Sequence, residues 1–373
     1  MNASPSRPPM SRRTFLKLLA AGGVTAAGAY VLSEYAPWLD YEGQVAQTWK
    51  LFGKETTVSA QKLELVRYAT LAANGHNTQP WKFAVQENAI EIHPDTSREL
   101  KIVDPDHREL WISLGCALEN LLVAARASGF AAEVTYPDSA EFIRVALTPD
   151  SPQSDPLFDA IPLRQNTRSE YDGQLIKTAD FDQVQTLPLE PGVSTHFITG
   201  PGGLETVLEY VNQGNLSQYA DPAFMDELIY WLRFNKKEAM SSMDGLFSKC
   251  SGNPEVPRWL GQMFVGSTKP QQQADIDAKK LRSSPAAVVI ALESDDKTAW
   301  VRAGQVYERL ALKTTSLNIK SAFLNQPIEV KDIRSQFQSA LGLGASMPQL
   351  LVRLGYAQAM PKSLRRPVEQ VLI

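Results

Sequence analysis

A short polar loop near residue 75 carries side chains suited to binding a ligand. The segment Asn74-Gly75-His76-Asn77-Thr78-Gln79-Pro80-Trp81 groups amide, imidazole and hydroxyl groups in a few positions. Several hydrogen-bond donors so close together suit the polar edge of a flat heterocycle. An alternative interpretation is a polar turn between a helix and a strand, with Trp81 in the core.

Two arginine clusters in the second half of the chain could hold an anion. Arg164 and Arg168 bracket Asn166, and both guanidinium groups share one face if this segment begins a helix. Together they could clamp a phosphate through charge-assisted hydrogen bonds. Arg365 and Arg366 add two cations near the C-terminus. Either cluster alone fits a solvated surface, but their occurrence with the Asn77 loop favours a binding site.

The N-terminal segment, residues 1–33, resembles a twin-arginine export signal. Ser11-Arg12-Arg13-Thr14-Phe15-Leu16-Lys17 precedes the apolar residues 18–32. Those residues are near the upper length of a signal core (about 7–15) and short of the roughly 20 that span a bilayer. We therefore expect export of the folded protein to the periplasm by the Tat translocase. An uncleaved signal would leave a membrane tether.

Composition describes a globular protein and excludes several classes of function. The 373 residues are 43% hydrophobic and 21% charged, with a net charge of −4. No basic run follows the signal segment, which argues against a nucleic-acid partner. The two cysteines and four histidines form no C-x-x-C or H-x-x-x-H pattern, so we predict no metal site. A disulfide between Cys116 and Cys250 after export stays open.

The first half of the chain, residues 59–150, is expected to contain two helices and four strands. Hydrophobic periodicity and turn residues place these elements at 60–72, 81–86, 89–93, 110–128, 132–136 and 143–147. Residues 34–58 ahead of them have the character of an exposed connector. The polar, proline-marked segment 151–156 predicts the junction with the second half.

The second half, residues 157–373, is expected to alternate helices and strands. The predicted elements lie at 194–198, 203–213, 222–240, 285–292, 297–317, 320–324, 331–341 and 350–355. Residues 244–273 contain several Gly and Pro and are predicted to form a loop that could act as a lid. These elements predict a compact mixture of helices and strands.

The two halves share a short sequence pattern. Gly115-x-x-Leu118-Glu119-x-Leu121 matches Gly304-x-x-Tyr307-Glu308-x-Leu310 without gaps, and each copy is a long helix that leads into a strand. The match suggests two related halves folded against one another. A generic helix-to-strand pattern could also produce it.

From about residue 60 to its C-terminus, the chain resembles the FMN-dependent nitroreductase family. Asn77-Thr78-Gln79-Pro80-Trp81 matches the family's N-x-Q-P-W loop, and Arg164-x-Asn166-x-Arg168 is similar to its R-x-S-x-R phosphate segment. Arg365-Arg366-Pro367 resembles the basic residues near the family's C-terminus. Asn325-Gln326-Pro327 occupies the place of the loop that approaches the flavin ring, and residues 348–356 resemble the final strand.

The resemblance implies a nitroreductase-like α+β fold in which the two halves form a pseudo-dimer within one chain. Each loop motif occurs in only one half, which implies one composite FMN site per chain. Arg164, Arg168 and either Arg365 or Arg366 would hold the phosphate, with a hydrogen bond from Asn166. The remaining contacts would come from the first-half loop and from the segment near the ring: Asn74, Gly75, His76, Asn77 and Gln79, with Gln326 and Pro327.

By the same resemblance, the protein is expected to be an FMN oxidoreductase that passes hydride or electrons to a small aromatic or quinone-like acceptor. The flavin would carry the chemistry, so no side chain is predicted as a catalytic acid or base. NAD(P)H is a cytoplasmic pool, so an exported enzyme would need another donor, such as a quinol or a redox protein. The alternatives are a flavin-binding protein for storage or sensing, and a surface interaction protein with a decayed site.

Overall fold

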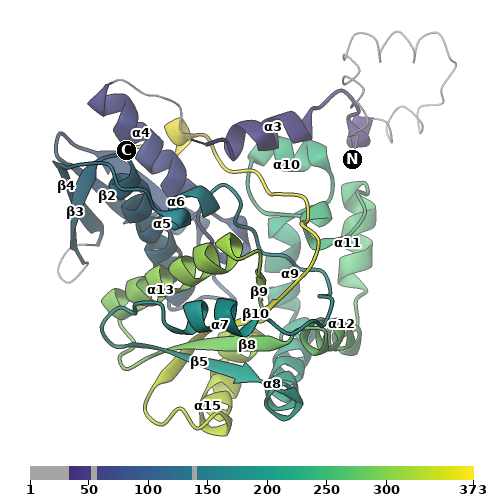
Figure 1. Cartoon of the computed structure of the whole chain (residues 1–373). Coiled ribbons are helices and arrows are strands. Elements are labelled where there is room, and N and C mark those ends of the chain that lie inside the picture. Colours follow the sequence, from purple (N-terminus) through teal and green to yellow (C-terminus); the bar gives the residue numbers. More distant parts are fainter. Residues whose placement is uncertain (1–32, 52–56, 137–140) are drawn as a thin grey trace, which may run out of the picture.

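Two antiparallel sheets, one from each half of the chain, enclose a pair of long helices (Figure 1). The computed structural model describes residues 33–51, 57–136 and 141–373, so the predicted export signal lies outside the described residues except for its last position. Each long helix packs on its own sheet, and the two helices pack against each other. The architecture is α+β, as predicted.

The first sheet has the strand order β1-β2-β4-β3, with every neighbouring pair antiparallel. Its strands are β1 (Trp81–Val85), β2 (Ala89–Pro94), β3 (Phe130–Thr135) and β4 (Ile143–Pro149). Helix α5 (Arg108–Ala127) connects β2 to β3 and packs against α4 (Val58–Thr70). Of the helices described, α5 alone is long and apolar enough to cross a membrane; 89% of its apolar window is buried, as in a core helix.

The second sheet has the order β5-β8-β10-β9, again antiparallel throughout. Its strands are β5 (Val193–Thr199), β8 (Ala286–Leu292), β9 (Lys320–Phe323) and β10 (Met347–Gly355). Every residue of β8 is buried, because helices cover both faces of the sheet. These helices are α13 (Lys297–Ser316) on the inner face and α8 (Pro201–Ala220), α12 (Pro270–Arg282), α14 (Gln326–Glu329) and α15 (Lys331–Ala340) on the outer.

The two halves are related by topology. Each sheet places its strands in the order first, second, fourth, third, and each has its long helix between the second and third strands. The matched glycines lie where α5 and α13 cross. A Cβ atom on Gly115 would lie 2.0 Å from the Val301 carbonyl oxygen, and one on Gly304 would lie 2.0 Å from that of Ile112. Only glycine permits this approach, which confirms the predicted relation between the halves.

Residues 34–51 of the predicted connector pack on the protein. They include helix α3 (Tyr41–Thr48), and the Tyr41 and Trp49 side chains are buried. Tyr41 donates a hydrogen bond to the Lys362 carbonyl at 2.7 Å, and Trp49 donates one to the Ser363 carbonyl at 2.9 Å. The prediction of an exposed connector was wrong because these aromatic anchors pack on a chain segment more than 300 positions away.

The predicted loop at 244–273 also contains regular structure, and the helix predicted at 222–240 is divided. The elements are α9 (Pro222–Trp231), β6 (Leu232–Arg233), α10 (Lys236–Ser242), β7 (Leu246–Phe247) and α11 (Arg258–Gly266). Glycine and proline mark the ends of these short elements rather than one long loop. Gly245 adopts a φ of +72° directly before β7, a conformation that glycine adopts without strain.

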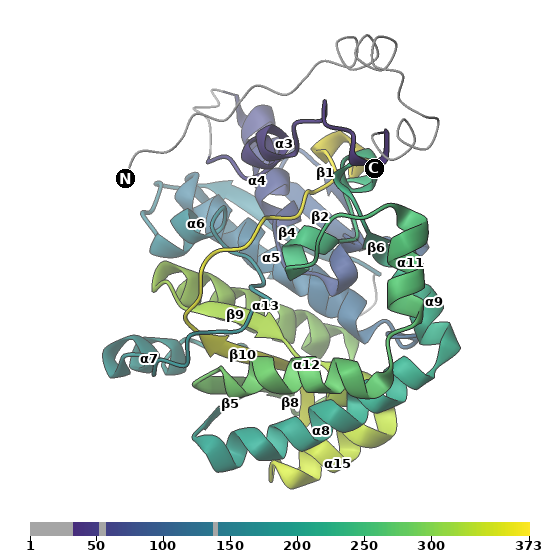
Figure 2. The same ribbon diagram turned by 90° about the vertical axis from the view of Figure 1, so that its right-hand side faces the viewer.

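The C-terminal segment returns from the second sheet to the first half of the chain. After β10 it passes α3 and ends beside β1, as the yellow ribbon in Figure 2 shows. The Phe83 amide donates to the Val371 carbonyl at 2.7 Å, and the Ile373 amide donates to the Phe83 carbonyl at 3.0 Å. This return carries Arg365 to the loop at residue 74.

Candidate functional site

Two adjoining cavities lie between the halves. The larger has a volume of about 220 Å³ and the smaller about 80 Å³, and both are lined by Asn74, Asn166, Arg168 and Leu246. The larger cavity extends under α8, α9 and α12 to β9 and α14. The smaller one extends to Trp49 and the C-terminal segment. Most of the residues predicted to bind a ligand therefore meet at one place, although they come from distant parts of the sequence.

The loop after α4 has an unusual backbone. His76, Asn77 and Gln79 all adopt positive φ angles, between 49° and 55°, which non-glycine residues rarely do. The Asn74 Oδ1 atom accepts a hydrogen bond from the Gln79 amide at 2.9 Å and closes the loop. Such conformations are typical of functional sites, because the surrounding contacts must offset their cost. Asn74, Gly75 and His76, three of the residues predicted to contact a ligand, line the larger cavity.

Asn77 and Gln79 play different parts in this loop. Asn77 lines the smaller cavity and donates from Nδ2 to the Gly245 carbonyl at 3.0 Å, while its buried Oδ1 has no partner among the described residues. Gln79 is fully buried and lines neither cavity. The Gln79 side chain donates from Nε2 to the Met243 carbonyl and accepts at Oε1 from the Arg366 backbone amide, each at 2.8 Å. The structure thus places Gln79 behind the loop as a support.

Arg365 and Arg366 face opposite directions. Arg365 lines the smaller cavity and donates to the Thr70 and Ala72 carbonyls, at 2.9 and 3.2 Å, at the end of α4. Burial and the nearby Arg164 charge lower the pKa of Arg365 to about 9. Arg366 lines neither cavity and lies 3.8 Å from Asp95. Of the two cations predicted as alternatives, Arg365 is the one at the site.

Arg164 and Arg168 differ in their partners. The Arg164 side chain is 3% exposed; it donates to the Leu71 carbonyl at 2.9 Å, and its Nε lies 2.9 Å from Glu308 Oε1. Arg168 lines both cavities, and within the described chain it has no hydrogen bond or ion pair. Desolvation by the surrounding protein lowers the Arg168 pKa. An unpaired guanidinium in a partly enclosed cavity indicates an anionic ligand.

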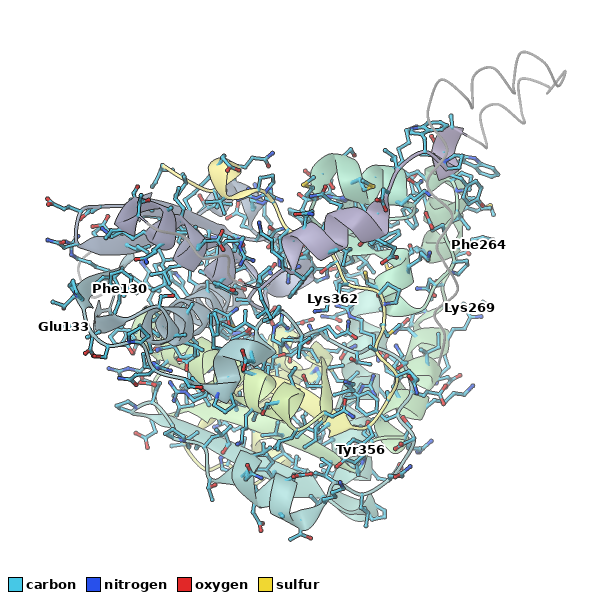
Figure 3. The ribbon with its side chains drawn as sticks, turned by 45° about the horizontal axis from the view of Figure 1, so that its top comes forward. Phe130, Glu133, Phe264, Lys269, Tyr356 and Lys362 are labelled. Carbon is cyan, nitrogen blue, oxygen red and sulfur yellow. The ribbon has the colours of Figure 1, made fainter. Side chains whose placement is uncertain are left out.

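Lys362 is a fourth cation of the smaller cavity that the sequence analysis did not identify. Its ammonium group donates to the Pro162 carbonyl and lies 4.3 Å from the centre of the Trp49 ring (Figure 3). Burial, followed by repulsion from Arg164 and Arg365, lowers the Lys362 pKa to about 7. No local motif marks this lysine, because only the return of the C-terminal segment to the first half places it beside the smaller cavity.

Asn166 lines both cavities, and His76 lines the larger one. Asn166 accepts a hydrogen bond from the Tyr307 hydroxyl at 3.2 Å and forms a bridge with Ser321 of β9, which holds the segment between the two arginines against that strand. Burial and the charge of Arg168 lower the His76 pKa to about 4. The imidazole is therefore neutral at pH 7 and adds no positive charge next to Arg168.

The far wall of the larger cavity is polar. Gln326 donates from Nε2 to Asp277 Oδ2 at 3.0 Å, and its buried Oε1 lacks a partner in the part of the chain described. Pro327, the other residue predicted there, faces the core and lines neither cavity. Burial, reinforced by the Glu329 charge, raises the pKa of Glu109 to about 8. Asp277 belongs to no recognisable motif, and Glu109 lies in an acidic helix start that the sequence explains without a ligand.

A metal centre has no support in the part of the chain that is described, where no group of three or more His, Cys, Asp or Glu side chains could hold an ion. Both cysteines are free thiols there, so the disulfide left open by the sequence is not formed. The site is instead a set of cations beside an amide-rich loop, a combination suited to an organic anion with a polar ring.

No protein-family model matches the chain. It is 27% identical over 319 residues to Rv3131 of Mycobacterium tuberculosis, a proposed NAD(P)H nitroreductase, covering 82% of this chain and 88% of that protein. It is 24% identical over 325 residues to another proposed NAD(P)H nitroreductase of that organism, acg, covering 82% and 93%. The chain is therefore related, over most of its length, to proteins assigned to the nitroreductase family.

Two solved structures illustrate a looser likeness. A nitroreductase with bound FMN from Bacteroides fragilis is 17% identical, covers 57% of this chain and 96% of that chain, and superposes with a TM-score of 0.33. The FMN-dependent nitroreductase NfnB of Mycobacterium smegmatis, in complex with NADPH, is 12% identical, covers 56% and 94%, and has a TM-score of 0.34.

Proposed function

We propose that this protein is an FMN-binding oxidoreductase of the nitroreductase type, with one composite site per chain. The observation that carries the proposal is the unpaired Arg168 at the junction of the two cavities, beside Arg164, Lys362 and Arg365. A phosphate monoester carries close to two negative charges at neutral pH, so it would supply the partner that Arg168 lacks and offset the positive charge of the other three cations.

The remaining residues fit the other parts of FMN. Asn77 Oδ1 and Gln326 Oε1 are buried acceptors without partners in the described chain, and a ribityl hydroxyl or ring N–H would satisfy such acceptors. A Cβ atom on Gly75 would lie 3.2 Å from Leu100 and 3.7 Å from Glu109, so a side chain at this position would crowd its neighbours. Asn74, Gly75 and His76 would face the polar edge of the ring.

Bound FMN would supply hydride or electron transfer, and the chain would supply position and electrostatics. Arg164, Arg168, Lys362 and Arg365 would hold the phosphate, while Asn166 keeps the arginine segment against β9. Leu246, which lines both cavities, and α9 and α12 would shield the site from water. The neutral His76 would leave the positive charge concentrated at the phosphate end.

The acceptor we propose is a small aromatic or quinone-like molecule, and the named activity of the mycobacterial relatives supports NAD(P)H as one donor to test. The twin-arginine pattern supports export by the Tat translocase to the periplasm, where a quinol or a redox protein would be the donor. Loading of FMN before export would account for the use of a pathway that moves folded proteins.

The first experiment is the visible absorption spectrum of the purified full-length protein, with the released chromophore quantified. We expect flavin bands and close to one FMN per chain. A colourless protein that also fails to bind added FMN would overturn the proposal. Turnover is then measured with NADH, NADPH or a reduced quinone analogue as donor and a nitroaromatic acceptor. Flavin without turnover would favour the storage or sensing alternative.

A further inference from the structure

The outer surface of α9 and α11 exposes large apolar side chains. Trp259 is 57% exposed, Met263 and Phe264 are each 54% exposed, and Tyr230 is 66% exposed. We call these four residues the α9–α11 face. Trp259 and Met263 are one helical turn apart, and α9 packs beside α11. Figure 3 shows Phe264 on the outer flank of the molecule, with Lys269 near it.

This face is held rigidly by the opposite side of α11. Gly261 is buried so close to Phe234 that a Cβ atom on it would lie 2.1 Å from the Phe234 ring. Arg258 pairs with Glu238 at 3.1 Å and fixes the start of the helix to α10. The apolar side chains therefore point outward because the inner side of the helix is already packed, and they cannot turn into the core.

The chemistry of the face suits a lipid surface. Soluble monomers rarely expose contiguous apolar patches of this kind unless the patch has a partner. Trp and Tyr are enriched where a protein meets the headgroup region of a bilayer, because each ring joins an apolar body to a polar tip. The exposed Lys269 directly after α11 adds a cation at the edge, where it can approach anionic lipids.

The position of the N-terminal segment points to the same partner. Tyr35 donates a hydrogen bond to the Glu255 carbonyl at 3.3 Å, and Glu34 pairs with Lys237 at 2.8 Å. Both contacts lie next to the start of α11, and Figures 1 and 2 show the first described turn of the chain beside that helix. The apolar residues 18–32 immediately precede this turn in the sequence, so an apolar tether would leave the protein at the α9–α11 face.

We propose that the α9–α11 face docks on a lipid bilayer, with Trp259, Met263, Phe264 and Tyr230 in the headgroup region. Helix α9 then separates the bilayer from the larger cavity, because its Phe224 and Leu228 side chains line that cavity. A docked protein would present its cavity wall to lipid-soluble redox molecules. The inference does not depend on FMN binding, since the face lies outside both cavities.

The first test is partition of the full-length protein onto vesicles of phosphatidylethanolamine and phosphatidylglycerol. The double variant Trp259→Ser, Phe264→Ser should bind at least tenfold more weakly than the parent protein. The matched control is Leu175→Ser, because Leu175 is 81% exposed in the segment before α7 (Thr178–Gln185) and is not part of the face. Equal binding of the double variant and the control would overturn the proposal.

The second test measures directly how the face lies relative to the bilayer. A nitroxide label is attached at Phe264→Cys or at Leu175→Cys in a Cys116→Ala, Cys250→Ser background. With vesicles, the label at 264 should become accessible to oxygen and protected from a water-soluble nickel complex, while the label at 175 stays accessible to nickel. Equal nickel access at both positions would contradict docking. Protection at 264 without vesicles would instead show that another protein segment or a second copy covers the face.

Discussion

The two long helices carry a glutamate at matched positions, and the two glutamates have different surroundings. On α5, Glu119 accepts hydrogen bonds from Arg309 at 2.8 and 2.9 Å. Arg309 also donates to Glu190 and to the Pro188 carbonyl, each at 2.7 Å. On α13, Glu308 accepts from the Ala73 amide at 3.2 Å and lies beside Arg164 without a well-directed hydrogen bond between Nε and Oε1.

This difference explains why unpaired positive charge gathers on one side of the core, at the candidate site. Near Glu119, the protein's own acceptors saturate the guanidinium of Arg309. Near Glu308, four cations meet around the smaller cavity, and Arg168 has no partner in the described chain. The matched glutamates of the two halves therefore differ in surroundings: Glu119 closes a structural ion pair, and Glu308 lies beside Arg164 at the candidate site.

The largest effect is expected from Arg309→Met. The Glu119 side chain is 2% exposed, and removal of its partner leaves a buried charge unpaired, which typically costs about 3–5 kcal/mol. The free energy of unfolding, measured by denaturant titration, should fall by that amount, while FMN affinity stays unchanged. If Arg309→Met lost as much FMN affinity as the cavity variant Arg168→Ala, the proposed difference between Glu119 and Glu308 would be wrong.

The opposite pattern is expected from Arg168→Ala. One charge-assisted hydrogen bond contributes about 1.5–3 kcal/mol, so FMN affinity should fall by about 10- to 100-fold. The ligand-free protein should be as stable as the parent or more stable, because an unpaired desolvated charge is removed. Fluorescence titration of FMN and thermal unfolding of the ligand-free protein measure the two effects. Unchanged affinity would remove Arg168 from the phosphate site.

Alanine at the helix crossing tests the structural equivalence of the halves. Gly115→Ala and Gly304→Ala each place a Cβ atom 2.0 Å from a carbonyl oxygen of the other helix. Overpacking of this kind costs about 1–3 kcal/mol, and the two variants should lose similar amounts of unfolding free energy. A control, Gly266→Ala, has no atom within 4 Å of the new Cβ and should have little effect. Sensitivity at only one of the two crossing glycines would contradict the pseudo-symmetry.

The smallest effect is a pH dependence that only the cavity half should show. The Lys362 pKa falls from 10.5 to about 7 on folding, so the unfolded state binds more protons between these values. The ligand-free protein should therefore gain stability as pH rises through this window. A bound phosphate would retain the proton, so FMN affinity should fall about fivefold between pH 7 and 8.

Lys362→Met provides the control for this pH dependence. FMN dissociation constants are measured at pH 7, 7.5 and 8, where the phosphate is mainly dianionic. The variant should bind FMN more weakly at pH 7 and show a nearly flat profile. If the FMN affinity of the variant changed with pH as steeply as that of the parent, another titrating group would be responsible. Glu109, whose pKa is raised to about 8 by burial, is one such group.

Local sequence signals determined much of this fold. The periodicity of α5 and α13 and the compact apolar run of β8 predicted individual helices and strands. The matched glycine patterns suggested two related halves, and the family resemblance implied the α+β fold that joins them. The residue types and their spacing also identified the loop at residue 74 and the arginine segment at 164–168. The structure brings both segments to the same cavities. Such features are readable because they depend on neighbouring residues.

Only the tertiary structure decided which of these side chains face the cavity. Arg365 lines it and Arg366 does not, although the two are adjacent in the chain. Lys362 and Trp49 join the site through contacts across hundreds of residues, and no local pattern marks them. Glu308 belongs to a pattern visible in the sequence, but only the fold places it beside Arg164. The physical reason is that burial, pKa and the balance of charges depend on every group within a few ångströms. For this site, those groups come from both halves and from the returning C-terminal segment.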